Sequence, residues 1–257
     1  RIGIETLLAL RVRLPRAKLV FTAHEFLTLC EANGHMVKEH TGALCHRAAP
    51  LDCAWCFPRK GVAYFEEREN AMRLFLDLCD TVEAPSRFLA GRLVQWGVPA
   101  RKVAYVPAVP GPAPTPRDTA PPDTAPAAGR QARPESADRR VVFGFLGHVV
   151  PHKGILLLLD AVARLPARQR DRMELRIHGL LHPNIGKAFR EAFDTRLHAL
   201  DERVCFEGPY DRASLPRILS RLDWLVFPSL WWENAPLVLR EASSHGVPVI
   251  TADVGGM

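Results

Sequence analysis

The sequence predicts an α/β protein built on doubly wound parallel sheets. Three observations lead to this prediction. Apolar runs of four to six residues alternate with longer segments whose apolar residues recur at helical spacing. Glycine, proline and small polar residues stand where these runs end, which is typical of strand ends and helix starts. The 257 residues, 47% of them hydrophobic, suffice for two modest cores.

The first part of the chain contains three expected strands and three expected helices. The strands are residues 19–22, 81–84 and 102–106. The helices are residues 1–13, 66–78 and 87–96. Ser86 is a good N-cap residue for the third helix, and Gly97-Val98-Pro99 ends it.

From residue 141 onward, strands and helices alternate. The expected strands are residues 141–146, 173–178, 203–206, 224–227 and 247–251. The expected helices are residues 155–165, 185–200, 211–222 and one that begins near Pro236 and stops at Gly246. Strands that alternate with helices in this way predict a parallel sheet.

Residues 107–140 contain nine prolines and few apolar side chains. This composition is typical of a linker that cannot bury a core. The sequence therefore predicts two domains, residues 1–106 and 141–257, joined by this linker.

Two carboxylates stand out in the last third of the chain. Glu233 follows the strand expected at 224–227, and Glu241 lies eight residues later inside a helix. If both were helical they would be roughly 12 Å apart along the axis, whereas the acid/base pair of a glycosidase needs about 5–9.5 Å. The spacing favours two carboxylates that hold different parts of one long ligand. An amphipathic helix with a buried glutamate is the alternative.

This segment resembles the glutamate-x7-glutamate signature of the retaining glycosyltransferases of family 4, which have the GT-B fold of two Rossmann-like domains. The other matching motifs occur in the family's order: His24, Lys153-Gly154, Pro228-Ser229 and Gly255-Gly256. The resemblance implies transfer of a sugar from a UDP- or GDP-linked donor to an acceptor hydroxyl, with retention of the anomeric configuration. It also implies glycan or polysaccharide biosynthesis. We expect the start of the first domain and the end of the second to lie outside this sequence.

The resemblance also assigns roles on the sugar side. Glu233 would meet the donor sugar, together with the backbone of Asn234, Ala235, Pro236 and Leu237. Pro236 has no N–H, so one backbone donor is missing there. Glu241 would hold the ribose hydroxyls. His24, which follows the strand at 19–22, would contact the donor sugar or the reacting centre; otherwise it is a strand-end histidine bonded to neighbouring backbone.

The diphosphate would bind at the turn after residues 141–146. A lysine and free amides at a helix start make an anion site, and Lys153 stands at such a start. Gly147 and His148 occupy the place of the family's glycine-arginine pair. An imidazole is a weaker phosphate partner than a guanidinium, so this departure leaves the catalytic strength open. Lys153 could instead be a solvated surface lysine. No catalytic metal is expected, because the lysine supplies the charge.

Four cysteines predict a structural zinc site. They follow the pattern C-x14-C-x7-C-x2-C, within a stretch of little apolar periodicity: Cys30, Cys45, Cys53 and Cys56. Four thiolates can close a tetrahedral site, and a CxxC pair supplies two ligands from one turn. A histidine (His35, His40 or His46) could replace one cysteine. An iron–sulfur cluster and reduced or disulfide-linked cysteines remain alternatives. Cys79 and Cys205 lie in apolar runs and are expected to be buried.

The charge distribution limits the partners. The net charge is +6, and residues 1–109 hold 15 Lys and Arg against 11 Asp and Glu. This excess suits phosphate-bearing substrates or an anionic membrane surface. No nucleic-acid motif accompanies it, so we expect no nucleic acid partner. The acceptor would be a sugar or glycan, with a lipid-linked one among the candidates.

The sequence also carries an expectation about location. It contains no apolar run of eighteen residues, and its first residues lack a small-residue cleavage site. We therefore expect a cytoplasmic protein, with at most peripheral contact at the inner face of the membrane. Two other functions stay open: a non-catalytic GT-B relative, and a metal-stapled interaction module built on the cysteine loop. A sugar-nucleotide epimerase fits the two glutamates less well.

Overall fold

The structure, a computed structural model, describes residues 4–107 and 139–257. These residues form two compact units. The N-terminal unit comprises residues 4–107, 231–235 and 254–257, and the C-terminal unit comprises residues 139–230 and 236–253. Two short segments of the predicted second domain thus pack with the first unit. Except for its two ends, the linker predicted at residues 107–140 lies outside the described residues.

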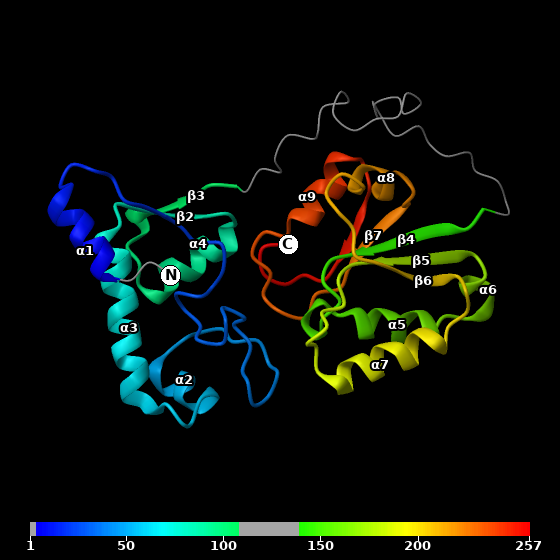
Figure 1. The fold of residues 1–257 in the computed structure, drawn as a ribbon, viewed down its shortest axis with the longest axis horizontal. Coiled ribbons are helices and arrows are strands. Elements are labelled where there is room, and N and C mark those ends of the chain that lie inside the picture. The colour runs from blue at the N-terminus through cyan, green and yellow to red at the C-terminus, as the bar shows by residue number, and fades with distance from the viewer. Residues whose placement is uncertain (1–3, 108–138) are drawn as a thin grey trace. The chain divides into compact units, whose positions relative to one another are not determined.

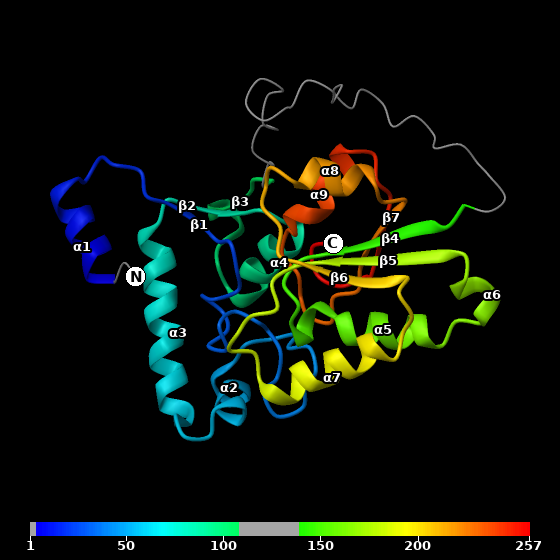
Figure 2. The same ribbon diagram turned by 45° about the vertical axis from the view of Figure 1, so that its right-hand side comes forward.

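The N-terminal unit is built on a three-stranded parallel sheet in the order β1-β2-β3 (Figures 1 and 2). The strands are β1 (Val20–Thr22), β2 (Thr81–Ala84) and β3 (Val103–Tyr105). The helices are α1 (Ile4–Arg13), α2 (Pro50–Cys56), α3 (Gly61–Leu78) and α4 (Arg87–Trp96), with a 3-10 turn at Ala100–Lys102.

The core of this unit lies between its sheet and its helices. Val82 of β2 packs in one buried cluster with Leu76 of α3 and Leu89 of α4. The hydroxyl of Ser86 accepts the Leu89 N–H at 3.0 Å, so the predicted N-cap is confirmed. Gly97 ends α4 in the left-handed region, at φ 115°. The cap and the buried face explain why α4 begins and ends as predicted.

The C-terminal unit has a five-stranded parallel sheet in the order β6-β5-β4-β7-β8. The strands are β4 (Val141–Leu146), β5 (Met173–His178), β6 (Val204–Gly208), β7 (Trp224–Phe227) and β8 (Val249–Thr251). The helices are α5 (Ile155–Ala163), α6 (Ala167–Arg170), α7 (Lys187–His198), α8 (Leu215–Ser220) and α9 (Leu237–Ser244), with a 3-10 turn at Pro151–Lys153.

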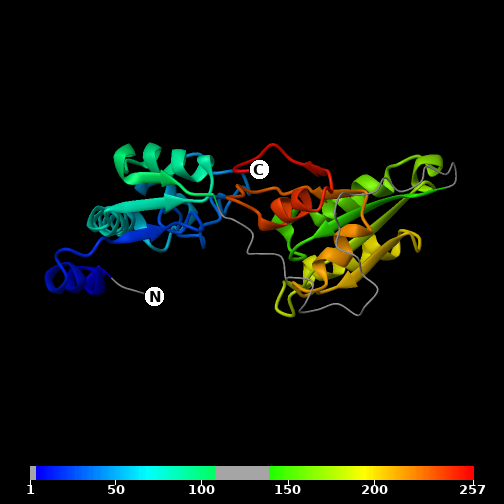
Figure 3. The ribbon, with the colours of Figure 1, turned by 90° about the horizontal axis from the view of Figure 1, so that it is seen from above.

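Helices cover both faces of this sheet. In Figures 1 and 2, α5 and α7 lie side by side on one face, and α8 and α9 lie on the other. Figure 3 views this unit from the side of α8 and α9. One buried cluster joins Ile177 to α5 and α7, and a second joins Leu225 to α8 and α9. The predicted α/β fold with parallel, doubly wound sheets is confirmed.

Several boundaries differ from the prediction. Helix α2 was not expected, because residues 50–56 lack apolar periodicity, but Pro50 is preorganised for a first helical turn. The CxxC pair therefore lies on a helix, not in a turn. α3 begins at Gly61, five residues earlier than expected. The helix expected at 211–222 starts only at Leu215, because the Asp211 carboxylate accepts the Ser214 N–H at 2.8 Å and holds a turn there.

Cys79 is buried as predicted. Cys205 is only half-buried, and its Sγ contacts the Glu202 carbonyl oxygen at 3.0 Å. None of the helices in the described residues has the length and apolar character needed to span a bilayer.

Candidate functional site

The loop after β4 lies at the switch point of the C-terminal sheet. β4 sits between β5 and β7, where the strand order reverses, and open α/β sheets bind ligands at such a point. Gly147 follows β4 with φ 146°, and the loop ends at Gly154, the N-cap of α5. The N-cap residue of α5, Gly154, has no side chain to cap the first turn, so it leaves these amides to a ligand.

Lys153 lies beside the end of β7. Its Nζ lies 5.1 Å from the ring centroid of Phe227, the last residue of β7. The Leu230 N–H donates to the His152 carbonyl at 2.8 Å. A Cβ on Gly154 would lie 1.9 Å from the Pro228 carbonyl oxygen, so only glycine fits there. A cation and free helix amides thus stand together, as a phosphate site requires.

The backbone of Gly147 is fixed from the neighbouring strand. Its N–H donates to the His178 carbonyl at 3.0 Å. Gly179 packs so closely that a Cβ there would lie 1.7 Å from the Gly147 carbonyl oxygen. The next residue, His148, is exposed, so its imidazole is accessible from solvent.

Glu241 lies on α9, whose first turn also has no side-chain cap. This helix begins at Leu237, directly after Pro236. Burial raises the pKa of Tyr210, and the charge of the half-buried Glu241 raises it further, which places the phenol near this carboxylate. Sequence reasoning did not single out Tyr210, because it stands in the loop after β6, outside any periodic segment.

His24 and Asn234 meet in the N-terminal unit. His24 stands just past β1, and the Asn234 side-chain amide donates to its carbonyl oxygen at 2.7 Å. The Ser86 hydroxyl, just past β2, donates to Asn234 Oδ1 at 2.6 Å. The Asn234 side chain therefore fixes the segment 231–235 at the carboxyl end of this sheet. The His24 side chain is exposed.

Glu233, in the same segment 231–235, is held through both its side chain and its backbone. It is 5% exposed, and Trp231 Nε1 donates to its Oε1 at 2.5 Å. The Gly256 N–H donates to the Glu233 carbonyl at 2.7 Å, and a Cβ on Gly255 would lie 2.3 Å from that oxygen. The carboxylate already has a partner, and the Gly255-Gly256 pair fixes the backbone.

The sequence-predicted site residues divide between the two units. The N-terminal unit holds His24, Glu233, Asn234, Ala235 and the four cysteines. The C-terminal unit holds Gly147, His148, Lys153, Pro236, Leu237 and Glu241.

The four cysteines predicted to bind a metal lie around one small cavity. All are free thiols and line one cavity of about 20 Å³: Cys30, Cys45, Cys53 and Cys56. Burial raises the pKa of Cys53 to about 11, and the charges of the other three thiolates contribute. As placed, however, no three His, Cys, Asp or Glu side chains of residues 4–107 and 139–257 are arranged to hold a metal ion. Zinc therefore stays a prediction.

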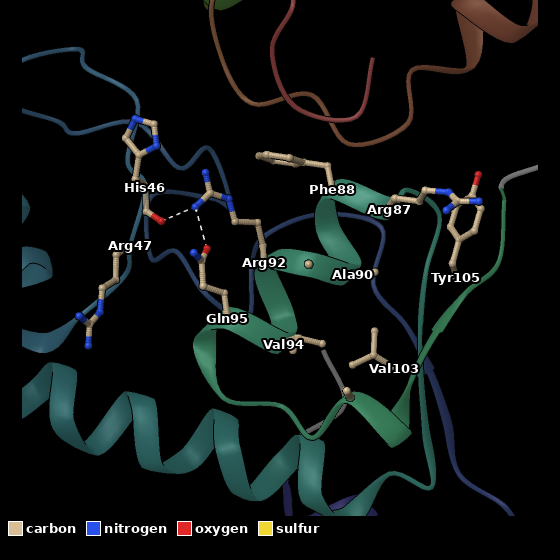
Figure 4. A pocket seen from close by; sticks show the side chains of 12 residues that line it. His46, Arg47, Arg87, Phe88, Ala90, Arg92, Val94, Gln95, Val103 and Tyr105 are labelled. Carbon is tan, nitrogen blue, oxygen red and sulfur yellow. Dashed lines mark hydrogen bonds between the residues drawn. The ribbon is translucent and has the colours of Figure 1, made fainter.

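A basic pocket of about 1010 Å³ lies over α4 (Figure 4). Its basic wall residues are His46, Arg47, Arg87 and Arg92. The Arg92 guanidinium lies 4.9 Å from the Phe88 ring centroid and donates to the His46 carbonyl. Of the residues singled out from the sequence, this pocket is lined by His46, which was named as an alternative metal ligand. Its only signal in the sequence is the excess of basic residues before residue 110.

Sequence comparison relates the second half of the chain to glycosyltransferases. Residues 130–257 match the family described as "Glycosyl transferases group 1". D-inositol 3-phosphate glycosyltransferase of Jonesia denitrificans is 34% identical over 118 residues, 45% of this chain and 28% of that protein. The protein of the same name from Mycobacterium sp. strain KMS is 32% identical over 127 residues, 46% and 26% of the two chains. The match thus spans about a quarter of each relative.

Structural comparison covers nearly the whole chain. HepE of Anabaena, solved with UDP and glucose, aligns with a TM-score of 0.58 at 18% identity, over 99% of this chain and 58% of HepE. Sucrose-phosphate synthase of Thermosynechococcus elongatus aligns with a TM-score of 0.62 at 21% identity, over 99% and 55%. Identities this low establish the fold alone. The chain has a Rossmann-like GT-B fold, and its residues 130–257 match the glycosyltransferase group 1 family.

Proposed function

We propose that this chain acts as a retaining glycosyltransferase of family 4, transferring a sugar from a nucleotide-sugar to an acceptor hydroxyl. The observation that carries the proposal is the loop from Gly147 to Gly154, where Lys153 stands beside the uncapped start of α5 at the switch point of the sheet. The group 1 match over residues 130–257 supports it. In this proposal the domains are residues 1–106 and 141–257.

The donor is proposed to be UDP-linked, with GDP as the alternative. The neighbour HepE was solved with UDP and with UDP-glucose. Glu241 is proposed to accept hydrogen bonds from the ribose hydroxyls, and the nearby Tyr210 adds an aromatic wall.

In the proposed reaction, negative charge develops on the leaving diphosphate. The bond from the anomeric carbon to the diphosphate oxygen breaks, and its electron pair leaves with the nucleoside diphosphate. The Lys153 ammonium, the α5 amides and the His148 imidazole would stabilise this developing charge, because oriented charges and dipoles act most strongly on the charge that forms in the transition state. The acceptor oxygen then bonds to the same face of the carbon and gives its proton to the departing diphosphate oxygen, which gives retention.

The sugar-side residues are proposed to act by positioning. His24 contacts the sugar through its exposed imidazole. Because the Glu233 carboxylate is bonded to Trp231, Glu233 presents the following backbone of Asn234 and Ala235 to the sugar. Pro236 adds no donor, and the N–H of Leu237 begins α9.

The acceptor is proposed to be a phosphate-bearing or lipid-linked sugar or glycan, used in polysaccharide biosynthesis at the cytoplasmic face of a membrane. The basic pocket over α4 supports an anionic acceptor. Replacing Arg47 and Arg87 by Ala should then raise the KM for such an acceptor by about tenfold and leave the KM for the donor unchanged.

The test is a transfer assay with UDP-hexose donors, in which NMR identifies the anomeric configuration of the product. Lys153→Ala should lower kcat by about a hundredfold or more, since it removes a charge used in the transition state. Lys187→Ala removes an exposed lysine of α7 and should leave the rate unchanged.

Wild-type protein that binds UDP but transfers no sugar would favour the second candidate, a non-catalytic GT-B relative. His148 at the arginine position is the observation behind that candidate. Inversion of the anomeric configuration would contradict the retaining assignment.

A further inference from the structure

The cysteines meet from three separate pieces of chain in the N-terminal unit. Cys30 lies in the loop after β1, and its N–H donates to the Phe26 carbonyl at 2.8 Å. Cys45 follows the single bridge between Val37 and Leu44. Cys53 and Cys56 lie three residues apart on α2, and so share one face of that helix.

The cavity between these sulfurs has the size and donors for one small ion. Its volume of about 20 Å³ exceeds the roughly 10–15 Å³ that a single water-sized sphere needs. Of the two carboxylates on its wall, Glu31 is already paired with Arg68 at 2.7 Å and with Lys60. The four thiols are the candidate donors, although Cys45 Sγ also contacts the Arg47 carbonyl oxygen at 3.3 Å, and thiolate sulfur favours zinc.

Two cations stand near the cavity. Lys38 lies on its wall, and Arg68 pairs with Glu31 there at 2.7 Å. They would offset part of the excess negative charge of a zinc ion with four thiolates.

The loop contains little regular secondary structure. Within residues 23–49, pairing between extended segments is limited to the bridge from Val37 to Leu44. Asn33 and the fully buried Met36 adopt positive φ angles of 49° and 52°, which is unfavourable for a methionine side chain. Buried packing and thiol contacts must hold this backbone, and a metal would do so more strongly.

We propose that Cys30, Cys45, Cys53 and Cys56 bind one zinc ion as a structural site with four cysteine ligands. Four thiols lose four protons to solvent as four zinc–sulfur bonds form. The sulfurs are not yet arranged as a coordination shell, so their side chains turn toward the centre of the cavity they already line.

The zinc site would also position the segment that carries Glu233. The Trp232 indole donates to the Cys45 carbonyl at 3.0 Å, and its ring packs against His46 at 5.2 Å between centroids. Trp232 directly precedes Glu233. This consequence rests on the proposed function, whereas zinc binding itself does not.

The test is elemental analysis of the purified full chain after expression with added zinc. Wild-type protein should hold about one zinc per chain, and Cys53→Ser/Cys56→Ser should hold at least about tenfold less. Cys79→Ser and Cys205→Ser, which change cysteines outside the cavity, are the matched controls and should keep their zinc.

If the double cysteine variant fails to fold, two measurements on wild-type protein still test the proposal. A thiol-blocking reagent on wild-type protein should release zinc in proportion to the thiols modified, and cobalt substitution should give the sulfur-to-cobalt charge-transfer band of a thiolate site. Wild-type protein without metal, protein that holds iron instead, or a disulfide among these four cysteines would each overturn the proposal. UDP binding is measured on the same samples, so failure here is distinguishable from failure of the transferase proposal.

Discussion

The loop at residues 147–154 and the cysteine loop at residues 23–56 both begin at the carboxyl end of a parallel strand, yet we propose that only the second needs its ligand to be complete. The first is fixed by backbone hydrogen bonds, such as that from the Gly147 N–H to the His178 carbonyl, and by glycine contacts. The second also has backbone hydrogen bonds, such as that from the Cys45 N–H to the Met36 carbonyl, and it adds the ion pairs of Glu31 and a cavity lined by thiols. In this proposal the first loop is formed before its ligand arrives, whereas zinc closes the second. The predictions below test this contrast.

The largest effect is expected from Gly154→Ala. The added Cβ would lie 1.9 Å from the Pro228 carbonyl oxygen, and φ at this position is 73°. Strain and overlap together should lower the free energy of unfolding by about 2–4 kcal/mol, as measured by urea denaturation. Gly186→Ala, whose Cβ would meet open space, is the control and should cost no more than about 0.5–1 kcal/mol. If both variants lost the same free energy of unfolding, the loop at residues 147–154 would have adjusted to the added Cβ. That result would contradict a preformed loop.

Metal removal should affect only the cysteine loop. After zinc is stripped by chelation, hydrogen exchange of amides in α2 and residues 23–49 should speed up by about tenfold or more, because an ordering contact is lost. Exchange of residues 147–154 should stay the same. A uniform increase over both units, or none in either, would contradict the contrast.

Ser86→Ala should have a moderate effect. It removes the N-cap of α4 and the hydrogen bond to Asn234, so unfolding should become easier by about 1–2 kcal/mol. Ser243→Ala is the control, because its exposed hydroxyl bonds only to the Leu239 carbonyl of the same helix. If both variants cost less than about 0.3 kcal/mol, Ser86 does not secure the segment 231–235.

The smallest effect concerns an exposed ion pair outside both loops. Hydrogen bonds from Arg203 lower the pKa of Asp201 from its usual 3.8 to about 2. The pairing therefore stabilises the protein above about pH 4, and this contribution is lost as the pH falls toward about 2. Asp201→Asn should be slightly less stable than wild type near neutral pH and match it near pH 2, in denaturation at several pH values. Asp194→Asn is the control variant. A stability difference between Asp201→Asn and wild type that persists near pH 2 would contradict the proposed role of this ion pair.

The sequence predicted most of the C-terminal unit correctly. β4, β5 and β7 have the predicted boundaries. β4 and β7 are continuous apolar runs, whereas β5 alternates buried apolar residues with Glu174, Arg176 and His178. The position of Lys153 followed from the strand-to-helix turn. The sequence could not show that Tyr210 lies near Glu241, because that proximity depends on how the loop after β6 folds against α9.

The N-terminal unit was harder to predict. The cysteine spacing indicated a shared site but not α2, whose seven residues have no apolar face pattern. The packing of residues 231–235 with the first unit was also missed. It depends on the long-range hydrogen bonds of Asn234 and Trp232, which no local pattern encodes. The basic pocket over α4 likewise collects arginines from distant parts of the sequence.

The most direct test of the central claim is calorimetric titration of the chain with UDP and with GDP. The account predicts that one nucleotide, UDP, binds, and that Glu241→Ala and Lys153→Ala each weaken its binding by about tenfold or more, roughly 1.4 kcal/mol. Lys187→Ala should bind it like wild type. UDP binding that neither Glu241→Ala nor Lys153→Ala weakens, or no binding of either nucleotide, would contradict the assignment of this loop and helix as the nucleotide site.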